Sequence, residues 1–291
     1  MSQGDTLIAV IGVTGAGKST FINKATGRND MKIGNSLNSC TSKVETTRFR
    51  IDNRWVTLID TPGFDDTELD DTDILRMIAD FLASTYKHQM FLTGIVFLQG
   101  INSNRVTGSE RTRTRLFEKV CGPGAYSNIV IGTTMWNQIS SQADGDKRMQ
   151  ERKSDPKFWG AMVAQGTRVV KHNNTSESAR DILRMLINKN TVRLQMQQEL
   201  VDKRGDVVDT SAGKFLDAEL GRTSERYQAR IHDLEKDRRH ADEVYDLRVK
   251  LEQVQVEKQK LRSAKVSFLL ELGLLGFDLG LRVLRRLRGA F

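Results

Sequence analysis

Short apolar runs alternate with stretches of helical periodicity along the first 190 residues of the chain. Runs of three to six apolar residues bounded by polar turns are typical of buried strands. Strands that alternate with helices predict a largely parallel sheet whose strands are joined by crossover helices. The predicted strands are residues 7–11, 56–59, 94–98, 129–131 and 169–170.

One further strand is predicted to run the opposite way. Residues 44–51 end in a turn-like Asp52-Asn53 pair just before Trp55. A short polar turn between two strand-like runs indicates a hairpin, so residues 44–51 are expected to pair antiparallel with the next strand. The pattern therefore predicts an α/β domain over residues 1–190, built on one mixed, mostly parallel sheet.

The pattern changes character after residue 190, where proline is absent and polar residues are abundant. One heptad series runs through residues 220–241 and another through 244–261, offset by a three-residue stammer. Several positions of the seam are polar, and Gly205 and Gly213 indicate a break before it. Residues 191–262 are therefore predicted to form a helical extension with a weak coiled coil.

The last segment, residues 263–291, is predicted to be an amphipathic apolar helix. Its polar residues recur at spacings that gather them on one narrow stripe: Ser267, Glu271, Asp278, Arg282 and Arg285. The apolar run is shorter than the ~20 residues that span a bilayer. The apolar side of this helix could contact either a membrane surface or protein. Glu271 and Asp278 disfavour an anionic membrane, so we expect a helix that folds back on the chain or self-associates.

Composition narrows the class of protein only a little. The 291 residues carry a net charge of +8, but the basic residues are spread along polar helical sequence, and a nucleic-acid partner is not expected. Cys40 and Cys121 lie far apart, and the four histidines lack metal-ligand spacing. The N-terminus has no signal-peptide pattern, so a cytoplasmic protein is expected, with peripheral membrane contact of the last helix as an alternative.

Residues 12–19 carry the strongest chemical signal in the sequence. Gly12, Gly17, Lys18 and Ser19 fit the pattern G-x-x-x-x-G-K-[ST] between a predicted strand and a helix, which is the context of a P-loop. Backbone N–H groups and a helix N-terminus surround a phosphate there, the lysine reaches the terminal phosphates and the hydroxyl binds Mg²⁺. The predicted phosphate-binding residues are Gly12, Thr14, Gly15, Ala16, Gly17, Lys18, Ser19 and Thr20.

A second element, Asp60-Thr-Pro-Gly63, follows the predicted strand at 56–59. Asp60 can hold magnesium through water, and the backbone N–H of Gly63 can meet a γ-phosphate while the loop behind it moves. Thr61 stands where an ATPase motor would place a glutamate, which favours a switch. In the polar loop between the two motifs we select Thr41, although other hydroxyls compete, to complete a magnesium site with Ser19 and Asp60. Lys18, Thr41 and Gly63 are the predicted catalytic residues.

The P-loop, the loop around Thr41 and the DTPG segment resemble the translation-factor-related GTPases, in the group of septins, chloroplast import receptors and GIMAP proteins. The sequence is most similar to uncharacterised fungal G-domain proteins, in GVTGAGKSTFIN, LIDTPGFDD, TTMW and RVVKHNNTSESARDIL. The resemblance covers residues 5–190. It implies the three-layer P-loop NTPase fold, GTP or GDP with Mg²⁺, slow hydrolysis, and nucleotide-dependent self-association as a homodimer or oligomer.

Base recognition departs from this family's pattern. Thr134-Met-Trp-Asn137 stands where a GTPase has [NT]-K-x-D, whose aspartate accepts two hydrogen bonds from guanine. Asn137 offers one acceptor oxygen, so guanine should be held less firmly, by ~1 to 2 kcal/mol. Trp136 could stack on the base or belong to the core. His172 or Asn173, after the last strand, could supply a further polar contact, or could simply cap a turn into the helix expected near residue 176.

The sequence also lacks the glutamine that positions water in signalling GTPases, because Phe64 follows Gly63. We therefore expect slow turnover. The arginines of residues 105–115 could assist hydrolysis in the active site of a partner molecule, or could form a solvated basic face. Thr107 and Glu110 in the same segment predict a capped helix start. The leading expectation is a GTP-binding switch or self-assembling GTPase. The alternatives are a nucleotide-binding scaffold tethered by its helical tail, with negligible hydrolysis, and an ATPase.

Overall fold

The computed structural model describes residues 6–28, 45–61, 70–87, 89–236 and 240–266. In this part of the chain six strands form one sheet, in the order β2-β3-β1-β4-β5-β6. Only β2 runs antiparallel, paired with β3, so the predicted mixed sheet and its hairpin are confirmed. The strands are β1 (Thr6–Gly12), β2 (Glu45–Ile51), β3 (Arg54–Asp60), β4 (Gly94–Gly100), β5 (Ile129–Thr134) and β6 (Arg168–Lys171).

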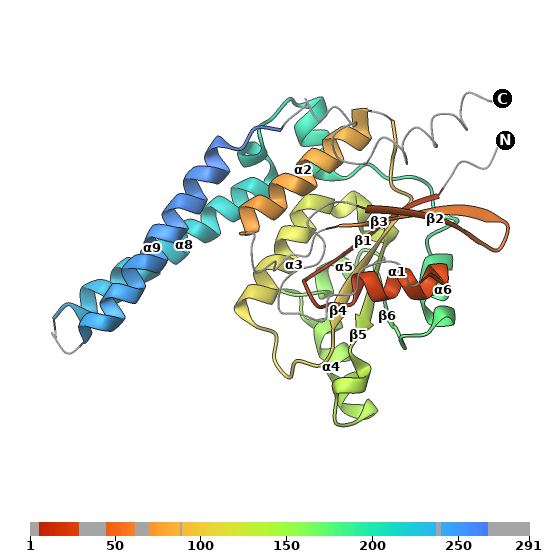
Figure 1. Ribbon diagram of the computed structural model, residues 1–291, viewed down its shortest axis with the longest axis horizontal. Helices are drawn as coiled ribbons and strands as arrows, with labels where there is room; N and C mark the ends of the chain where they lie inside the picture. The colour runs from red at the N-terminus through yellow and green to blue at the C-terminus, as the bar shows by residue number, and fades with distance from the viewer. Residues whose placement is uncertain (1–5, 29–44, 62–69, 88, 237–239, 267–291) are drawn as a thin grey trace.

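Helices cover both faces of the sheet, which confirms the three-layer α/β fold (Figure 1). On one face α1 (Lys18–Thr26) and α6 (Ser176–Arg184) bury apolar side chains such as Phe21 and Ile182 against the sheet. On the other face α2 (Asp71–Lys87) and α3 (Gly108–Cys121) do the same with Ile78 and Phe117. A sheet covered on both faces needs apolar residues on both, which is why β1 is buried along its whole length.

Smaller helices complete the domain at one edge of the sheet. These are the 3₁₀ helices η1 (Pro123–Asn128) and η2 (Trp136–Gln138), and the α-helices α4 (Gln142–Ser154) and α5 (Gly160–Val163). The predicted helix starts are confirmed. Thr107 and Glu110 form a reciprocal capping box at the start of α3, and α6 begins at Ser176 with Thr175 as its cap.

The parallel register brings the carboxyl ends of the strands to one edge of the sheet. Val10 of β1 lies level with Asp60 of β3, and Gly100 of β4 lies level with Thr134 of β5. Gly12 ends β1 against the backbone of β4, where a Cβ atom would lie 2.6 Å from the carbonyl oxygen of Leu98. This edge is where open α/β sheets bind their ligands.

The region after residue 190 is helical and closes over the α2 and α3 layer. It contains α7 (Gln195–Gln197), a π-helical turn η3 (Gln198–Asp202), the 3₁₀ helix η4 (Val207–Asp209), α8 (Ser211–Leu234) and α9 (Ala241–Ser263). Met196, Leu200, Val207 and Leu216 belong to the same buried cluster as Phe117 of α3. The helical extension therefore shares a core with the α/β domain.

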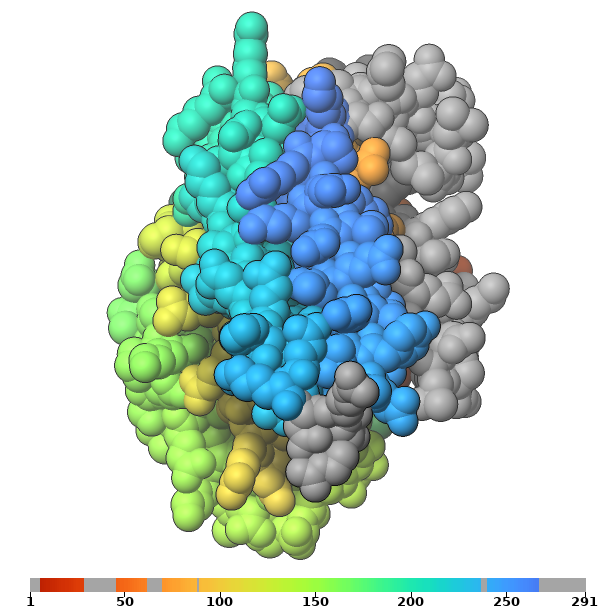
Figure 2. Space-filling model, turned by 90° about the vertical axis from the view of Figure 1, so that its left-hand side faces the viewer, coloured from red at the N-terminus to blue at the C-terminus, as the bar shows by residue number. Residues whose placement is uncertain are grey.

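Helices α8 and α9 run antiparallel as a hairpin and lie side by side across one face of the molecule (Figure 2). Ion pairs link Arg230 to Glu243, Glu235 to Arg248 and Asp217 to Arg262. Most of the first heptad series lies in α8 and the second lies in α9, but the offset between them, from Ala241 to Val244, falls in the first turn of α9 and not in the turn between the helices. Within the described residues the two helical segments pack as this antiparallel pair, and the coiled coil predicted for residues 220–261 stays a prediction.

Several expectations concern residues outside the described part of the chain. These are the magnesium ligand Thr41, Gly63 and Phe64 of the second motif, and nearly all of the amphipathic segment at 263–291. In the described part of the chain no helix is both long enough and apolar enough to cross a membrane. Cys121 is a free, buried thiol.

Candidate functional site

The loop between β1 and α1 forms a tight turn that depends on two glycines. Gly15 and Gly17 have φ angles of 78° and 91°, in the left-handed region that residues with a Cβ rarely adopt. The backbone N–H of Ala16 donates to the carbonyl of Val13 at 3.0 Å, and α1 begins directly after Gly17. The loop thus leads into the N-terminus of a nine-residue helix, the arrangement that binds phosphate groups.

Lys18 crosses the mouth of this loop. Its ammonium group donates to the carbonyl oxygens of Gly12 and Val13, at 3.1 and 3.2 Å. These bonds hold the ammonium group beside the backbone of the P-loop, and the Lys18 side chain is largely buried. A cation fixed there favours a negatively charged ligand over a neutral one.

Ser19 and Asp60 meet at the start of α1, although 41 residues separate them in sequence. The Ser19 hydroxyl donates to Oδ2 of Asp60 at 3.3 Å, and the Asp60 side chain is 1% exposed. Thr61 fixes the end of β3, because its hydroxyl donates to the carbonyl of Val10 at 3.0 Å. A hydroxyl and a carboxylate beside a phosphate loop are the hard oxygen donors that suit Mg²⁺.

The end of β5 supports the same loop from the other side. Thr134 is buried, and its hydroxyl donates to the carbonyl of Ala16 at 3.0 Å. Met135 follows with a φ of 61°, a left-handed turn that starts η2, and Asn137 is exposed. The structure therefore brings Lys18, Ser19, Asp60 and Thr134 together at the carboxyl edge, with Asn137 at the exposed end.

Trp136 belongs to the core of this corner and does not face the site. Its indole N–H donates to the backbone carbonyl and the hydroxyl of Thr133, at 2.9 and 3.1 Å. The ammonium group of Lys171 lies 4.2 Å from the centre of the ring, and the ring packs closely on Gly145 of α4. Of the two expectations for Trp136, core packing holds and base stacking does not.

His172 and Asn173 follow β6, and they differ in exposure. His172 is 4% exposed, its Nδ1 lies 2.9 Å from the hydroxyl of Ser178, and its ring meets the edge of Phe21. Burial, with a smaller effect of Lys24, lowers the pKa of His172 to about 4, so the ring is neutral near pH 7. Asn173 is exposed and is the better placed of the two for contact with a base.

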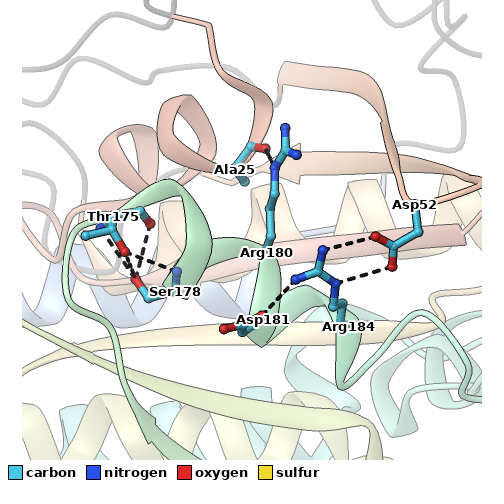
Figure 3. Close-up of polar contacts among 7 residues, drawn as sticks. All are labelled: Ala25, Asp52, Thr175, Ser178, Arg180, Asp181 and Arg184. Carbon is cyan, nitrogen blue, oxygen red and sulfur yellow. Dashed lines mark hydrogen bonds and ion pairs between the residues drawn. The ribbon is translucent and has the colours of Figure 1, made fainter.

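Two arginines of α6 fix the elements around the site, and the sequence analysis missed both. Arg180 donates from Nε to the carbonyl of Ala25 at the end of α1, at 3.0 Å (Figure 3). Arg184 pairs with Asp52 in the β2–β3 turn at 3.0 Å, and with Asp181 on its own helix at 2.8 Å. The hydrogen bond from Arg184 is the main cause of the lowered pKa of Asp52. No local signal reveals these pairs, because their partners lie 155 and 132 positions away.

Residues 7–113 match the family model described as "50S ribosome-binding GTPase". This match covers β1, the P-loop, Asp60 and the start of α3.

The domain has the fold of a P-loop GTPase.

A curated relative and several solved structures resemble this GTPase domain. "GTP-binding protein A" of Dictyostelium discoideum is 27% identical over 142 residues, which are 47% of this chain and 29% of that protein. The chain thus spans less than a third of that relative. A dimerization-deficient mutant of Toc33 from Arabidopsis thaliana superposes with a TM-score of 0.52 at 14% identity, over 65% of this chain and 86% of the other. Toc33 in complex with Mg²⁺ and GMPPNP gives a TM-score of 0.50 at 14% identity, over 65% and 87%.

Proposed function

We propose that this protein binds GTP and GDP with Mg²⁺, hydrolyses GTP slowly and acts as a nucleotide-dependent switch or self-assembling GTPase. The observation that carries the proposal is the convergence of three motifs at one sheet edge. The P-loop, the Ser19–Asp60 contact of 3.3 Å and the Thr134–Ala16 contact of 3.0 Å come from three separate strands.

Ser19 and Asp60 are the described residues that would hold the magnesium ion, with Thr41 as the third predicted ligand. The described residues contain no group of three or more His, Cys, Asp or Glu side chains that could hold a metal without a nucleotide. A site with one hydroxyl and one carboxylate instead suits an ion whose remaining ligands are phosphate oxygens and water. The bound ion would neutralise charge on the transferred phosphoryl group.

Slow turnover is supported by the residue types at two positions of the second motif, Thr61 and Phe64. Thr61 stands where some ATPases place a water-activating glutamate, and its hydroxyl is already bonded to the Val10 carbonyl. Phe64 has no group that could position water. Hydrolysis would therefore depend on Lys18, Gly63 and Thr41 at the phosphates, and on any residue supplied by a partner.

An ATPase is the second candidate, and Asn137 is the observation that favours it. The carboxylate of the usual [NT]-K-x-D aspartate accepts both guanine N–H groups, whereas Asn137 accepts with one oxygen. We rank GTP first because the domain itself matches a GTPase family and Thr134 keeps its support of the P-loop.

We further propose self-association through the GTPase domain, in the septin/GIMAP-like class. Dimerization is important for the GTPase activity of the chloroplast translocon components atToc33 and psToc159. The arginines of residues 105–115, before and along α3, are candidates for the residue that a partner would supply. A cytoplasmic location, with the segment at 263–291 on a membrane or folded on the domain, belongs to the same proposal.

Purified full-length chain, assayed with radiolabelled GTP and ATP, tests the proposal. We expect slow GTP turnover that Lys18→Ala abolishes, together with loss of nucleotide binding. A preference for ATP overturns the GTP assignment, and GTP binding without measurable hydrolysis favours the scaffold alternative. Identification of the nucleotide released on denaturation gives an independent result.

A further inference from the structure

A cavity lies between the β4–α3 connection and α4. Its volume is about 410 Å³, within the range of sites for small molecules. Figure 1 shows the connection from β4 to α3 running next to α4. The charged residues of its wall are Arg105, Arg111, Arg148, Arg152, Glu151 and Asp155.

Two arginines one turn apart on α4 build the cavity. Arg148 donates to the carbonyls of Ile101 and Asn102, at 3.2 and 3.0 Å. Arg152 donates to the carbonyls of Gly100 and Ser103, at 2.7 and 2.9 Å. These bonds fix the connection after β4 along α4 and leave further N–H donors on both guanidinium groups.

Arg152 carries an unbalanced buried charge. The residue is 4% exposed, and its guanidinium has no carboxylate within 4.0 Å among the described residues. Burial lowers the pKa of Arg152, and Glu110 opposes this effect from the first turn of α3. Phe158 and Trp159 lie beside the guanidinium, at 6.0 and 5.6 Å from their ring centres. Carbonyl oxygens and aromatic rings surround this guanidinium, Glu110 acts on it only at longer range, and a bound anion would add a direct charged partner.

The other charges of the wall leave a net positive site. Arg111 pairs with Asp155 at 2.6 Å, and that pair is locally neutral. Arg105 is exposed, and among the described residues its side chain makes no hydrogen bond or ion pair. Glu151 is exposed on α4 and is the remaining acid. Arg105, Arg148 and Arg152 therefore outnumber the nearby acids, Glu151 in the wall and Glu110 in the first turn of α3.

We propose that this cavity binds an organic phosphate, a small molecule with a phosphate group and hydroxyl groups. The guanidinium groups of Arg105 and Arg148 match the geometry of phosphate oxygens, which they can meet through paired N–H donors. Glu151 accepts hydrogen bonds from the hydroxyl groups of the ligand. The cavity exceeds the volume of a bare phosphate, which leaves room for the organic part.

The test uses the full chain with Lys18→Ala, because that change removes the phosphate affinity expected of the P-loop. Glycerol 3-phosphate is titrated calorimetrically at low salt, with inorganic phosphate and succinate as comparison ligands. We expect glycerol 3-phosphate to bind, and an added Arg105→Glu change to weaken its binding by at least about tenfold. Arg105 holds no other element in place, so the variant should fold.

Lys147→Glu is the matched control, since Lys147 lies next to Arg148 on α4, is exposed and does not line the cavity. This variant should leave binding unchanged. Equal losses in the two variants, or no binding at all, overturn the proposal, and equal affinity for succinate overturns the assignment to phosphate. Because no nucleotide is needed in the assay, failure here leaves the proposed GTP binding untouched.

Discussion

At the residue scale, Asn137 is the residue proposed to set how firmly guanine is held. Replacing its amide with a carboxylate by Asn137→Asp restores the second acceptor oxygen for the base. We expect GTP and GDP to bind about 1 to 2 kcal/mol more tightly, or roughly 5- to 30-fold, while ATP gains nothing. Titration with each nucleotide measures the change.

Gln138→Glu is the control for that experiment, because it adds the same charge one position away on η2. Its side chain accepts a hydrogen bond from Asn102 at 2.8 Å, a contact that glutamate can keep. If both variants tighten GTP equally, general electrostatics and not base recognition is responsible.

Ser19 is expected to make nucleotide binding depend on magnesium. Its hydroxyl already lies 3.3 Å from the Asp60 carboxylate. Ser19→Ala removes one oxygen donor, so we expect Mg²⁺ to be bound at least about tenfold more weakly. GTP affinity measured with and without EDTA reports this effect, and an unchanged ratio between the two conditions would contradict the assignment of Ser19.

Side-chain direction is what the sequence could not supply at this scale. The P-loop pattern located Lys18 and Ser19 because the spacing itself defines the loop. For Trp136 the same register allowed two directions, and only packing against Gly145 and Lys171 selects the core. The Arg184–Asp52 pair lay beyond sequence reasoning altogether, since it depends on how α6 meets the β2–β3 turn.

At the scale of elements, the end of α9 holds the start of α2. Glu257 accepts hydrogen bonds from the backbone N–H and hydroxyl of Thr72, at 3.3 and 3.4 Å. Lys260 pairs with Asp70 at 3.1 Å and also with Asp73. Because α2 is the first helix after the DTPG segment, a change of nucleotide that shifts α2 would strain these contacts with the hairpin.

This junction predicts a pH dependence of stability. Burial, with repulsion from Asp70 and Asp71, raises the pKa of Glu257 from 4.5 to about 7, and the bonds from Thr72 only partly oppose this. The folded protein therefore holds the Glu257 proton more tightly than the unfolded chain does. Its contribution to the free energy of unfolding is fully present below about pH 4.5 and is lost as the pH rises through 7.

Glu257→Gln should flatten that part of the pH profile. Urea unfolding between about pH 5 and 8 measures this effect, because that interval covers the titration of Glu257. Glu252→Gln on the same helix is the control, because Glu252 is exposed. Buried Glu118 on α3, whose pKa also rises to about 7 by desolvation, should leave a residual slope. If the Glu257→Gln variant had the same pH profile as the wild type, Glu257 would not be the cause of the pH dependence.

The helical pattern predicted the elements of the extension better than their arrangement. Heptad spacing is the same for a long coiled coil and for two helices that fold back on each other, because both use one apolar seam per helix. The break in phase between the two series, from Ala241 to Val244, falls in the first turn of α9, a few residues after the chain has already turned back.

At the scale of the whole molecule, the extension and the GTPase domain share one core. Leu194, Met196 and Val207 are buried in the cluster that contains Phe117 and Val120 of α3. A boundary at residue 190, which the change in composition suggested, separates two kinds of sequence and not two independent cores.

Truncation tests this shared core. A chain that ends at residue 190 would expose the apolar outer side of α2 and α3, so we expect a lower melting temperature and aggregation. A chain that ends at residue 266 keeps the extension and should melt close to the full-length protein. Equal melting temperatures for the two shortened chains would show that the domain does not need the extension.

The antiparallel course of α8 and α9 has a practical consequence for labelling. The chain leaves the GTPase domain along α8 and returns along α9, so that Val266 is buried in the same cluster as residues of α2 and α3. A fluorophore or fused protein attached directly after Val266 would sit against the GTPase domain, whereas one placed at the exposed Tyr245, near the distal turn, would stand away from it. Distance measurements between these two positions would report bending of the hairpin, independently of any nucleotide assay.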